Sequence, residues 1–424
     1  MKIRLRPSQL FGTLPIIASK SLSHRYLIAA GLAEGESTIH NILDAEDIEA
    51  TRHALKALNV KFDGNKVIGG QFKLVTSTTN IKASGSTLRF MIPIFMLQAN
   101  PVTLIGDKRF FERSLQPYEE VFFKKGLDIA IYPHDESFSV TVKGPLINGT
   151  YHLKGDVSSQ FVTGLLFALP LLNGDSEIIF TSKVVSGPYI DLTLLTLDHF
   201  GIVYELKKQA IYIPGKQKYH PQNLFVEGDY SQAAFWFVAG TIQNSNKPLQ
   251  LLGLNPNSKQ GDKQIVEIIT NMGGRIIYDE NNDSYLVYPK KTASTTIDLQ
   301  HIPDLGPILM VLAAVSEGIT YFKNTERLRI KESDRFAVMV HFLEMIGIHI
   351  KTDKNEMLIT GQKQIMGNFN FDAPADHRII MALTILSLKI KGEVIIQNAH
   401  HIQKSYPTFF QDFKKLGGHV DEIT

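Results

Sequence analysis

Apolar and polar positions along the chain follow one pattern that repeats six times. In each copy a polar or small residue opens an apolar helix, a strand follows, and a second helix and another strand complete the unit. The starts lie 65 to 73 residues apart, whereas simple solenoid repeats have periods of roughly 20–50 residues. The pattern therefore predicts six copies of a larger supersecondary unit. The first helices are expected to begin near Ser21, Ser86, Ser159, Ser231, Asp304 and Asp376.

The second helix of each unit carries an independent marker of the same period. It ends, before a β-branched run, at a residue that tolerates left-handed backbone. Two markers that share one period argue against a chance alignment. The six residues are Asn59, Gly126, Gly201, Gly273, Gly347 and Gly417.

The two kinds of helix differ in where their apolar residues lie. First helices such as residues 308–315 are apolar on nearly all sides, which is typical of buried helices. Second helices such as residues 47–58 are amphipathic. We therefore predict an α/β (α+β) architecture with buried helices inside and sheets and amphipathic helices outside. Strands are indicated by β-branched runs at residues 177–180, 276–278 and 393–396.

Length and composition bound the organisation of the protein. A chain of 424 residues is long enough for two or three domains, and six repeats divide into two sets of three. The expected boundary between the two sets is the polar stretch at residues 226–231, which precedes the first helix of the fourth repeat. A hydrophobic content of 44% with 20% charged residues is typical of a globular protein with a full core.

Charge and targeting signals narrow the function. A net charge of +2 gives no global basic field, so any anion site must be local and nucleic-acid binding is not expected. The absence of cysteine excludes disulfides, thiolate metal sites and cysteine nucleophiles. The first ten residues do not resemble a secretory signal, and the apolar helices are too short to span a membrane. We therefore expect a cytoplasmic protein.

The helix starts suggest a local anion site. A helix N-terminus carries unpaired N–H groups and about half a positive charge, so equivalent N-termini aimed at one place would bind anions in a cleft. The alternative is that serine and aspartate at these positions act only as helix caps, and this is the preferred interpretation for Ser231. The six stretches read SKSLSHR, SGSTLR, GDVSSQ, GDYSQ, HIPD and ADHR.

Five of these stretches, all but GDYSQ, together with four other strings resemble a known enzyme family, the 5-enolpyruvylshikimate-3-phosphate synthases. The similarity covers essentially the whole chain, and the strings occur in the family's order and approximate spacing. Each string alone is a weak signal, but nine in register on a six-unit repeat are specific. They are SKSLSHR, SGSTLR, DKRFFER, GDVSSQF, SGPYIDLTL, HIPD, RIKESDR, DHR and KSYP.

The resemblance implies a fold and an activity. The fold is a two-domain inside-out α/β barrel of six βαβαββ repeats, three per domain, with the active site in the cleft between domains. One domain would be discontinuous, residues 1–19 plus 229–424, and the other continuous, residues 20–228. The family transfers the carboxyvinyl group of phosphoenolpyruvate to the 5-hydroxyl of shikimate 3-phosphate in the shikimate pathway, and glyphosate inhibits it. Addition and elimination pass through a tetrahedral intermediate and release phosphate.

The resemblance also implies site residues. For phosphoenolpyruvate they are Lys20, Gly85, Arg109, Gln160, Arg335, Arg378 and Lys404. For shikimate 3-phosphate they are Ser21, Arg25, Ser158, Ser159, Gln160, Ser186, Tyr189, Asp304, Arg327 and Lys331. Lys20, Asp304 and Glu332 are the expected catalytic residues, with Asp304 accepting the 5-hydroxyl proton and Glu332 near the methylene carbon. Arg89 and Arg113 are either supporting or purely structural residues.

No cofactor and no metal are implied, because a C–O bond breaks and no phosphoryl group is transferred. The histidines, among them His24, His377, His400 and His401, lack the spacing of a known metal motif, and the resemblance makes His377 a supporting residue. The protein is expected to act as a monomer on small molecules. Two alternatives stay open: the sister enolpyruvyl transferase acting on UDP-N-acetylglucosamine, which usually uses a cysteine acid, and a non-catalytic anion-binding relative.

Overall fold

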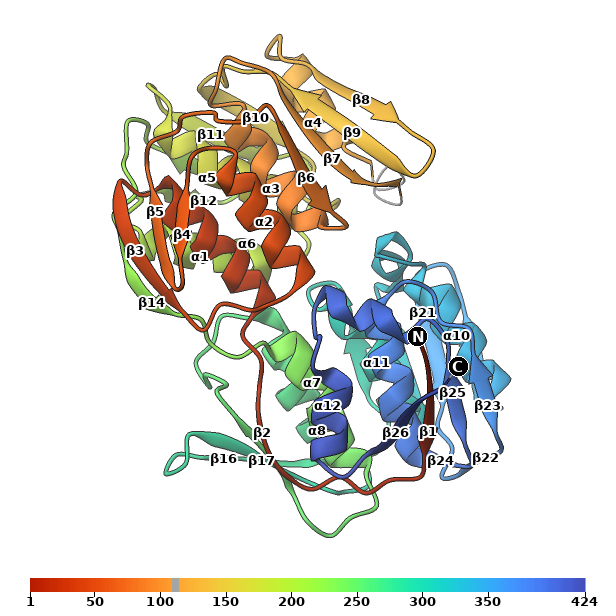
Figure 1. The fold of residues 1–424 in the computed structure, drawn as a ribbon. Helices are drawn as coiled ribbons and strands as arrows, with labels where there is room; N and C mark the ends of the chain where they lie inside the picture. The colour runs from red at the N-terminus through yellow and green to blue at the C-terminus, as the bar shows by residue number, and fades with distance from the viewer. Residues whose placement is uncertain (109–113, 424) are drawn as a thin grey trace. The chain divides into compact units, whose positions relative to one another are not determined.

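The computed structural model describes residues 1–108 and 114–423. The chain forms two compact units: unit 1 contains Met1–Ile17 and Glu227–Thr424, and unit 2 contains Ala18–Val226. Both units are mixed α/β structures (Figure 1).

Unit 2 contains three copies of the repeat. Its elements are α1 (Lys20–Leu32), β3 (Gly35–His40), α2 (Glu46–Lys56), β4 (Lys61–Asp63), β5 (Lys66–Gly69), β6 (Thr78–Lys82), α3 (Gly85–Phe95), β7 (Val102–Asp107), α4 (Gln116–Phe123), β8 (Ile129–Pro133), β9 (Ser137–Val142), β10 (Gly149–Leu153), α5 (Ser159–Ala168), η2 (Leu169–Leu171), β11 (Ser176–Phe180), α6 (Gly187–His199), β12 (Glu205–Lys207), β13 (Ala210–Ile213) and β14 (Asn223–Phe225).

Unit 1 contains the other three copies. Its elements are β1 (Lys2–Arg6), β2 (Gly12–Pro15), α7 (Tyr230–Ile242), β15 (Leu249–Leu252), η3 (Gly261–Lys263), α8 (Gln264–Asn271), β16 (Arg275–Asp279), β17 (Ser284–Tyr288), β18 (Thr296–Asp298), η4 (Pro303–Leu305), α9 (Gly306–Val315), β19 (Ile319–Lys323), η5 (Thr325–Ile330), α10 (Arg335–Met345), β20 (His349–Thr352), β21 (Glu356–Thr360), β22 (Ile365–Met366), β23 (Phe369–Phe371), α11 (His377–Leu386), η6 (Ser387–Lys389), β24 (Ile390–Lys391), β25 (Val394–Ile396), η7 (Ala399–Lys404), α12 (Phe409–Lys415) and β26 (His419–Ile423).

In the residues that the structure describes, six four-stranded sheets share one topology, which confirms the six-fold repeat. In each, the first two strands are parallel and the remaining pairs are antiparallel, as in β6-β7-β9-β8 and β18-β19-β21-β20. Two strands follow the second helix in the first five repeats, rather than the single strand that the residue pattern indicated, and in the sixth repeat β26 pairs with the N-terminal strand β1. The observed βαβαββ unit is the one that the family resemblance implied.

Two sheets take their first strand from a part of the chain that is distant in sequence. Strand β2 directly precedes α1 but pairs with β15 of unit 1, and β14 directly precedes α7 but pairs with β3 of unit 2. The N-terminal strand β1 lies between β25 and β26 and completes the sixth sheet. The N-terminal segment is thus an integral part of unit 1, although about 210 residues of unit 2 separate the two in sequence.

The predicted helix boundaries agree closely with the structure. Five first helices begin within one residue of the expected start, at Lys20, Gly85, Ser159, Tyr230 and His377. The exception is α9, which begins two residues late because the short helix η4 contains Asp304.

All six residues predicted to end the second helices have positive φ, from 67° at Asn59 to 102° at Gly417. The amide of the residue after each of them donates to a carbonyl five residues earlier, for example Val60 to Leu55 and Ile348 to Leu343. These bonds are those of the Schellman motif, which satisfies carbonyls at a helix end.

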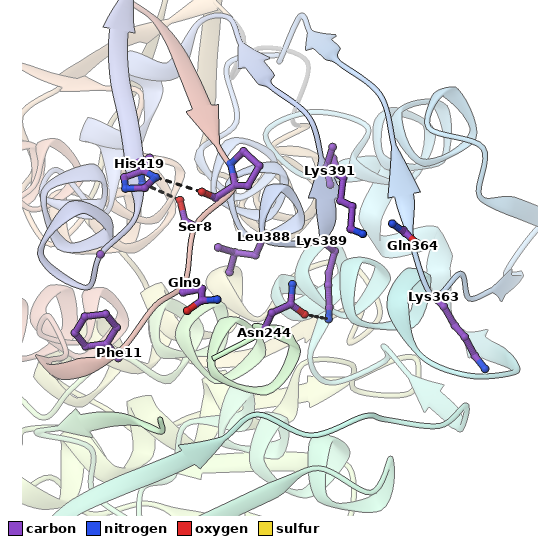
Figure 2. A pocket seen from close by; sticks show the side chains of 13 residues that line it. Ser8, Gln9, Phe11, Asn244, Lys363, Gln364, Leu388, Lys389, Lys391 and His419 are labelled. Atoms are coloured by element: carbon purple, nitrogen blue, oxygen red, sulfur yellow. Dashed lines mark hydrogen bonds between the residues drawn. The ribbon is translucent and has the colours of Figure 1, made fainter. Parts of the chain in front are cut away.

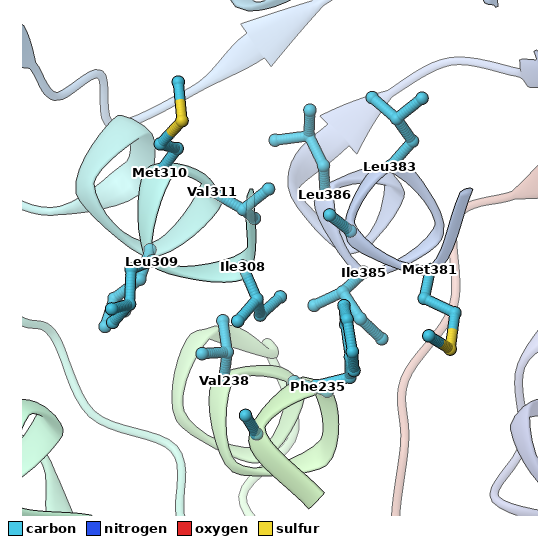
Figure 3. Packing of buried hydrophobic residues seen from close by; sticks show 14 of the residues in the cluster. Phe235, Val238, Ile308, Leu309, Met310, Val311, Met381, Leu383, Ile385 and Leu386 are labelled. Atoms are coloured by element: carbon cyan, nitrogen blue, oxygen red, sulfur yellow. The ribbon is translucent and has the colours of Figure 1, made fainter. Parts of the chain in front are cut away.

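Buried helices form the centre of unit 1. Helices α7, α9 and α11 pack together, and every residue of α11 is buried. Phe235 and Val238 of α7 face Ile308 of α9 and Ile385 of α11 (Figure 3). The second helices are amphipathic as predicted: on α2, Ile48 and Leu55 are buried, whereas Lys56 is exposed.

In unit 2, helices α3 and α5 pack against each other, and this contact requires a glycine. A Cβ at Gly164 of α5 would collide with the Tyr118 hydroxyl and the Arg89 carbonyl oxygen. The Tyr118 hydroxyl lies 2.8 Å from the Arg89 carbonyl oxygen and 2.9 Å from that of Phe161, so it links α4 to both helices. Both the packing and this bridge depend on the missing side chain.

Gly164→Ala should therefore lower the free energy of unfolding by about 1–3 kcal/mol, the usual cost of overpacking. Urea denaturation would measure the loss. Gly187→Ala is a matched control, because a Cβ at Gly187 meets no atom within 4 Å. Equal stability of the two variants would contradict the assignment of Gly164 to a close helix contact.

Candidate active site

A cluster of charged side chains occupies one part of unit 1, where η4, η5, α10 and α11 begin or end. Its centre is Arg335, the first residue of α10, whose side chain is only 1% exposed. The Arg335 guanidinium contacts three carboxylates: Asp304 at 3.0 Å, Glu332 at 2.5 Å and Asp376 at 2.8 Å. Asp376 is itself fully buried and caps α11 by accepting from the Arg378 amide.

Asp304 receives three cations. The Lys331 ammonium lies 3.0 Å from Oδ1, Arg335 contacts the same oxygen, and Arg378 lies 3.3 Å from Oδ2. Burial opposes ionisation of the Asp304 carboxyl, but the charges of Arg378, Lys331 and Arg335 outweigh it and hold its pKa well below the usual value. The cap interpretation of Asp304 is wrong, because no side chain caps α9.

The remaining cations of the cluster surround the same carboxylates. Lys404, at the end of η7, lies 3.8 Å from Glu332. Arg327 is buried on η5, close enough for its charge to lower the pKa of Lys331, although burial is the larger cause of that shift. Among the described residues, these ion pairs join the cations Lys331, Arg335, Arg378 and Lys404 to the carboxylates Asp304, Glu332 and Asp376. The cluster therefore carries a net positive charge suited to anions.

In unit 2 a second cationic group is buried without a counter-charge. The Arg25 guanidinium donates to the carbonyl oxygens of Ser21 and Tyr189, each at 2.8 Å, and to the Thr193 hydroxyl at 2.9 Å. In the part of the chain that the structure describes, all its hydrogen-bond partners are uncharged oxygens. Burial lowers its pKa to about 9, so it remains a cation at neutral pH. An incoming anion would compensate this charge.

Lys20 is the first residue of α1 and forms an ion pair. Its ammonium lies 3.0 Å from the carboxylate of Asp47, a buried residue in the first turn of α2. The pair holds Lys20 at the helix start, where Ser19 caps α1.

Other polar residues that were predicted for the site also lie at helix starts in unit 2. Ser158 caps α5 by accepting from the Gln160 amide, and Ser159 is the first, buried residue of that helix. The Gln160 side chain accepts from Arg89 at 2.8 Å and donates to Ser86 at 3.0 Å. These contacts make Arg89 a supporting residue of Gln160.

Two further predicted residues shape the helix starts. Gly85 is the buried first residue of α3. Ser186 precedes α6 in the left-handed conformation, with φ of 57°. Arg109 and Arg113 lie outside the described residues.

The structure corrects one assignment and adds three carboxylates. Ser231 was expected to cap the first helix of the fourth repeat, which is α7. Instead, Asp229 caps α7, and the Ser231 hydroxyl donates to Asp262. Burial and the nearby charge of Asp304 raise the pKa of Asp262 to about 6. Sequence reasoning missed Asp47, Asp262 and Asp376 as charge partners. The available signal was an acidic residue at the start of a helix, which is equally the signal of a cap.

His24 has a structural role that can be tested. It is fully buried on α1, its Nδ1 lies 2.7 Å from the Thr51 hydroxyl, and Thr51 in turn contacts Thr87. Burial, reinforced by Lys20 and Arg25 and opposed by Asp47, lowers its pKa from 6.5 to about 3. His24 is therefore neutral in the folded protein down to about pH 3.

Between pH 6.5 and 3 the unfolded chain binds one more proton at His24 than the folded chain, so stability is lost as pH falls through this range. For each pH unit of acidification in this range, the free energy of unfolding of wild type should fall by up to about 1.4 kcal/mol more than that of His24→Phe. Urea unfolding at several pH values measures this difference, and other titrating groups cancel between the two proteins. His53→Phe on the exposed face of α2 is the control. Parallel pH profiles for wild type and His24→Phe would refute a buried neutral His24.

Among residues 1–108 and 114–423, no group of three or more His, Asp or Glu side chains is arranged to hold a metal ion. In the same residues, no helix has both the length and the apolar character needed to cross a membrane.

Comparison with known proteins decides the family. The family model described as EPSP synthase (3-phosphoshikimate 1-carboxyvinyltransferase) matches residues 5–413. The chain belongs to the EPSP synthase family. Curated members with similar sequences include the 3-phosphoshikimate 1-carboxyvinyltransferases of Clostridium novyi, 42% identical, and Clostridium perfringens, 41% identical. The first alignment covers 99% of this chain and 98% of the relative, and the second covers 98% of each.

Solved structures support the fold of an EPSP synthase. The EPSP synthase of Acinetobacter baumannii matches with a TM-score of 0.82 at 23% identity, covering 99% of this chain and all of the other. The enolpyruvyl transferase NikO of Streptomyces tendae matches with a TM-score of 0.79 at 17% identity, covering 100% and 99%. The two-domain α/β fold expected from the sequence is thereby confirmed.

Proposed function

We propose that this protein transfers the enolpyruvyl group of phosphoenolpyruvate to the 5-hydroxyl of shikimate 3-phosphate and releases phosphate. Membership of the EPSP synthase family assigns it to the 3-phosphoshikimate 1-carboxyvinyltransferases of the shikimate pathway. The observation that carries the residue roles is the Asp304 carboxylate held among Lys331, Arg335 and Arg378. It combines a proton acceptor with binding groups for two anionic substrates.

The low pKa of Asp304 describes the protein without substrates. In that state the three cations stabilise the ionised carboxylate, which makes it a weak base. When the phosphate and carboxylate groups of phosphoenolpyruvate pair with Arg335, Arg378 and Lys404, part of that stabilisation is withdrawn. The proton affinity of Asp304 then rises where it is needed, beside the 5-hydroxyl. Substrate binding thus activates the base.

The reaction proceeds by addition and elimination. The 5-hydroxyl oxygen bonds to C2 of phosphoenolpyruvate as its proton passes to Asp304, and the methylene carbon receives a proton to become a methyl group. In the second step the methyl carbon loses a proton, the bond between C2 and the phosphate oxygen breaks, and phosphate leaves. Glu332 and Lys20 exchange the proton at this carbon. Glu332 lies between Arg335 and Lys404, so its proton affinity depends on the same substrate charges.

Residues of both units contribute to binding in this proposal. Arg25 supplies an uncompensated charge for shikimate 3-phosphate, and the helix starts add hydroxyl and N–H donors for its phosphate. The other residues proposed for this substrate are Ser21, Ser158, Ser159, Gln160, Ser186, Tyr189, Arg327 and Lys331. Lys20, Gly85, Arg109 and Gln160 complete the set proposed for phosphoenolpyruvate.

The activity is tested by phosphate release. We expect release only when phosphoenolpyruvate and shikimate 3-phosphate are both present, and none when UDP-N-acetylglucosamine replaces shikimate 3-phosphate. An Asp304→Asn enzyme prepared in parallel controls for contaminating phosphatases. Release with phosphoenolpyruvate and UDP-N-acetylglucosamine, but not with phosphoenolpyruvate and shikimate 3-phosphate, would instead identify the sister transferase.

Adding a chelator such as EDTA should leave the rate of phosphate release unchanged, because C–O cleavage requires no charge-neutralising ion at a transferred phosphoryl group. The measurement compares initial rates before and after chelation, and then with added Mg²⁺. Loss of activity that Mg²⁺ restores would contradict the metal-free mechanism. We further propose that the enzyme works as a monomer in the cytoplasm, which gel filtration and cell fractionation would test.

A further inference from the structure

Unit 1 contains a cavity of about 730 Å³ that is separate from the charged cluster. The segment between β1 and β2 forms one wall, and η6 with β24 forms another (Figure 2). Helix α11 separates the two sites: Asp376 and Arg378 lie at its start, whereas Leu388 and Lys389 follow its end. A ten-residue helix is about 15 Å long, so the cavity is not a part of the proposed active site.

The lining of the cavity is cationic. Its thirteen residues include Lys363, Lys389, Lys391 and His419 and contain no aspartate or glutamate. Lys363 alone among the three lysines has an acidic partner in the described residues, Glu317 at 3.4 Å. The cavity therefore presents positive charge that the protein itself largely leaves uncompensated.

Lys389 shows that this arrangement has an energetic cost. It is half-buried, and its ammonium donates to the Asn244 side-chain oxygen at 3.0 Å, as Figure 2 shows. Burial and the nearby charge of Lys291 lower its pKa. A desolvated lysine beside a like charge destabilises the unliganded protein, and such costs are typical of functional sites.

The cavity also has an apolar wall. Leu388 and Ile390 line it from η6 and β24, and Phe11 lines it from the N-terminal segment with 48% of its surface exposed. The Lys247 ammonium lies 5.0 Å from the centre of the Phe11 ring and adds positive charge near this wall. The volume lies within the range of small-molecule sites, roughly 300–1,000 Å³. A bare inorganic ion would leave most of it empty.

We propose that this cavity binds a small organic phosphate whose charged group pairs with Lys389 and Lys391 and whose apolar body packs against Phe11 and Leu388. The phosphate supplies the negative charge that the lysines lack, through charge-assisted hydrogen bonds. The site is independent of the chemistry at Asp304, so its occupancy can be measured without turnover.

Phenyl phosphate is the probe, because it combines a dianion with one aromatic ring. Isothermal titration should show binding to wild type that weakens about tenfold or more in Lys389→Met/Lys391→Met, since two charge-assisted contacts are removed. Any binding at the active site is common to both proteins and drops out of the comparison. Lys351→Met, an exposed lysine on β20, is the matched control and should bind as wild type does. Inorganic phosphate should bind more weakly than phenyl phosphate.

Thermal unfolding gives a second, opposite signature. Without ligand, Lys389→Met should unfold at a higher temperature than wild type, because it removes a desolvated charge. With phenyl phosphate, the ligand-induced rise seen in wild type should be smaller in the variant. Lys391 is exposed, so Lys391→Met should not affect folding. The kcat of this variant should equal that of wild type. Equal affinities of wild type and the lysine variants, or equal binding of inorganic and phenyl phosphate, would overturn the proposal.

Discussion

Replacing Asp304 with asparagine should lower kcat by about 10²- to 10⁴-fold, the usual contribution of a general base. The KM for phosphoenolpyruvate should change far less, because Arg335 and Arg378 remain. Asparagine keeps the size of the side chain and the hydrogen bonds to its carbonyl oxygen, but it cannot accept the 5-hydroxyl proton. An effect confined to kcat identifies an interaction made in the transition state rather than in ground-state binding.

Steady-state kinetics on wild type, Asp304→Asn and Asp353→Asn would measure this effect. Asp353 is exposed on the same unit, so its variant should retain wild-type kcat. Thermal unfolding should accompany the kinetics, because Asp304 pairs with three cations and its loss also affects stability. A folded Asp304→Asn enzyme with near wild-type kcat would remove Asp304 from the catalytic residues.

The repeat could be predicted from the sequence because its markers are local. A residue with positive φ at the end of each second helix is required by the Schellman motif, whatever surrounds it. Asn59 and Gly417 therefore mark the same kind of helix end in the first and the last repeat. The uniformly apolar first helices likewise report burial, because nothing but other apolar surface can cover them.

Features that depend on distant parts of the chain could not be predicted from residue patterns. The pairing of β2 with β15 and of β14 with β3 is one, since each strand lies directly before a helix of the other unit but joins a sheet of its own unit. The start of α9 is another. A polar residue before an apolar run normally caps the helix, but Asp304 lies in η4 and turns its carboxylate to three cations from other elements.

The charge partners were hidden for the same reason. Asp47 and Asp376 both occur in the sequence at helix starts, where a cap or a dipole interaction is sufficient explanation. Their pairing with Lys20 and Arg335 spans 27 and 41 residues. The family motifs identified the cations that are proposed to bind substrate, whereas only the structure identified Asp47 and Asp376 as the carboxylates that pair with Lys20 and Arg335.

Arg335→Met should destabilise unit 1 by about 3–5 kcal/mol, the cost of removing one partner from a buried ion pair. The reason is Asp376, which is fully buried and has Arg335 as its cationic partner at 2.8 Å. Without the guanidinium, its negative charge would lie in the protein interior uncompensated. The exposed pair of Arg6 and Asp421 provides the control, and Arg6→Met should cost at most about 1 kcal/mol.

A second substitution separates lost charge pairing from lost packing. Asparagine at position 376 can still cap α11 but carries no charge. If the uncompensated carboxylate causes the destabilisation, Arg335→Met/Asp376→Asn should be more stable than Arg335→Met alone, as measured by urea unfolding of the three proteins and wild type. Identical stability of the single and double variants would show that the guanidinium contributes through packing. The activity of both variants should be lost in either case, because Arg335 is also proposed to bind phosphoenolpyruvate. The stability measurements therefore report the role of the Asp376 carboxylate, and the activity measurements report the role of Arg335 in substrate binding.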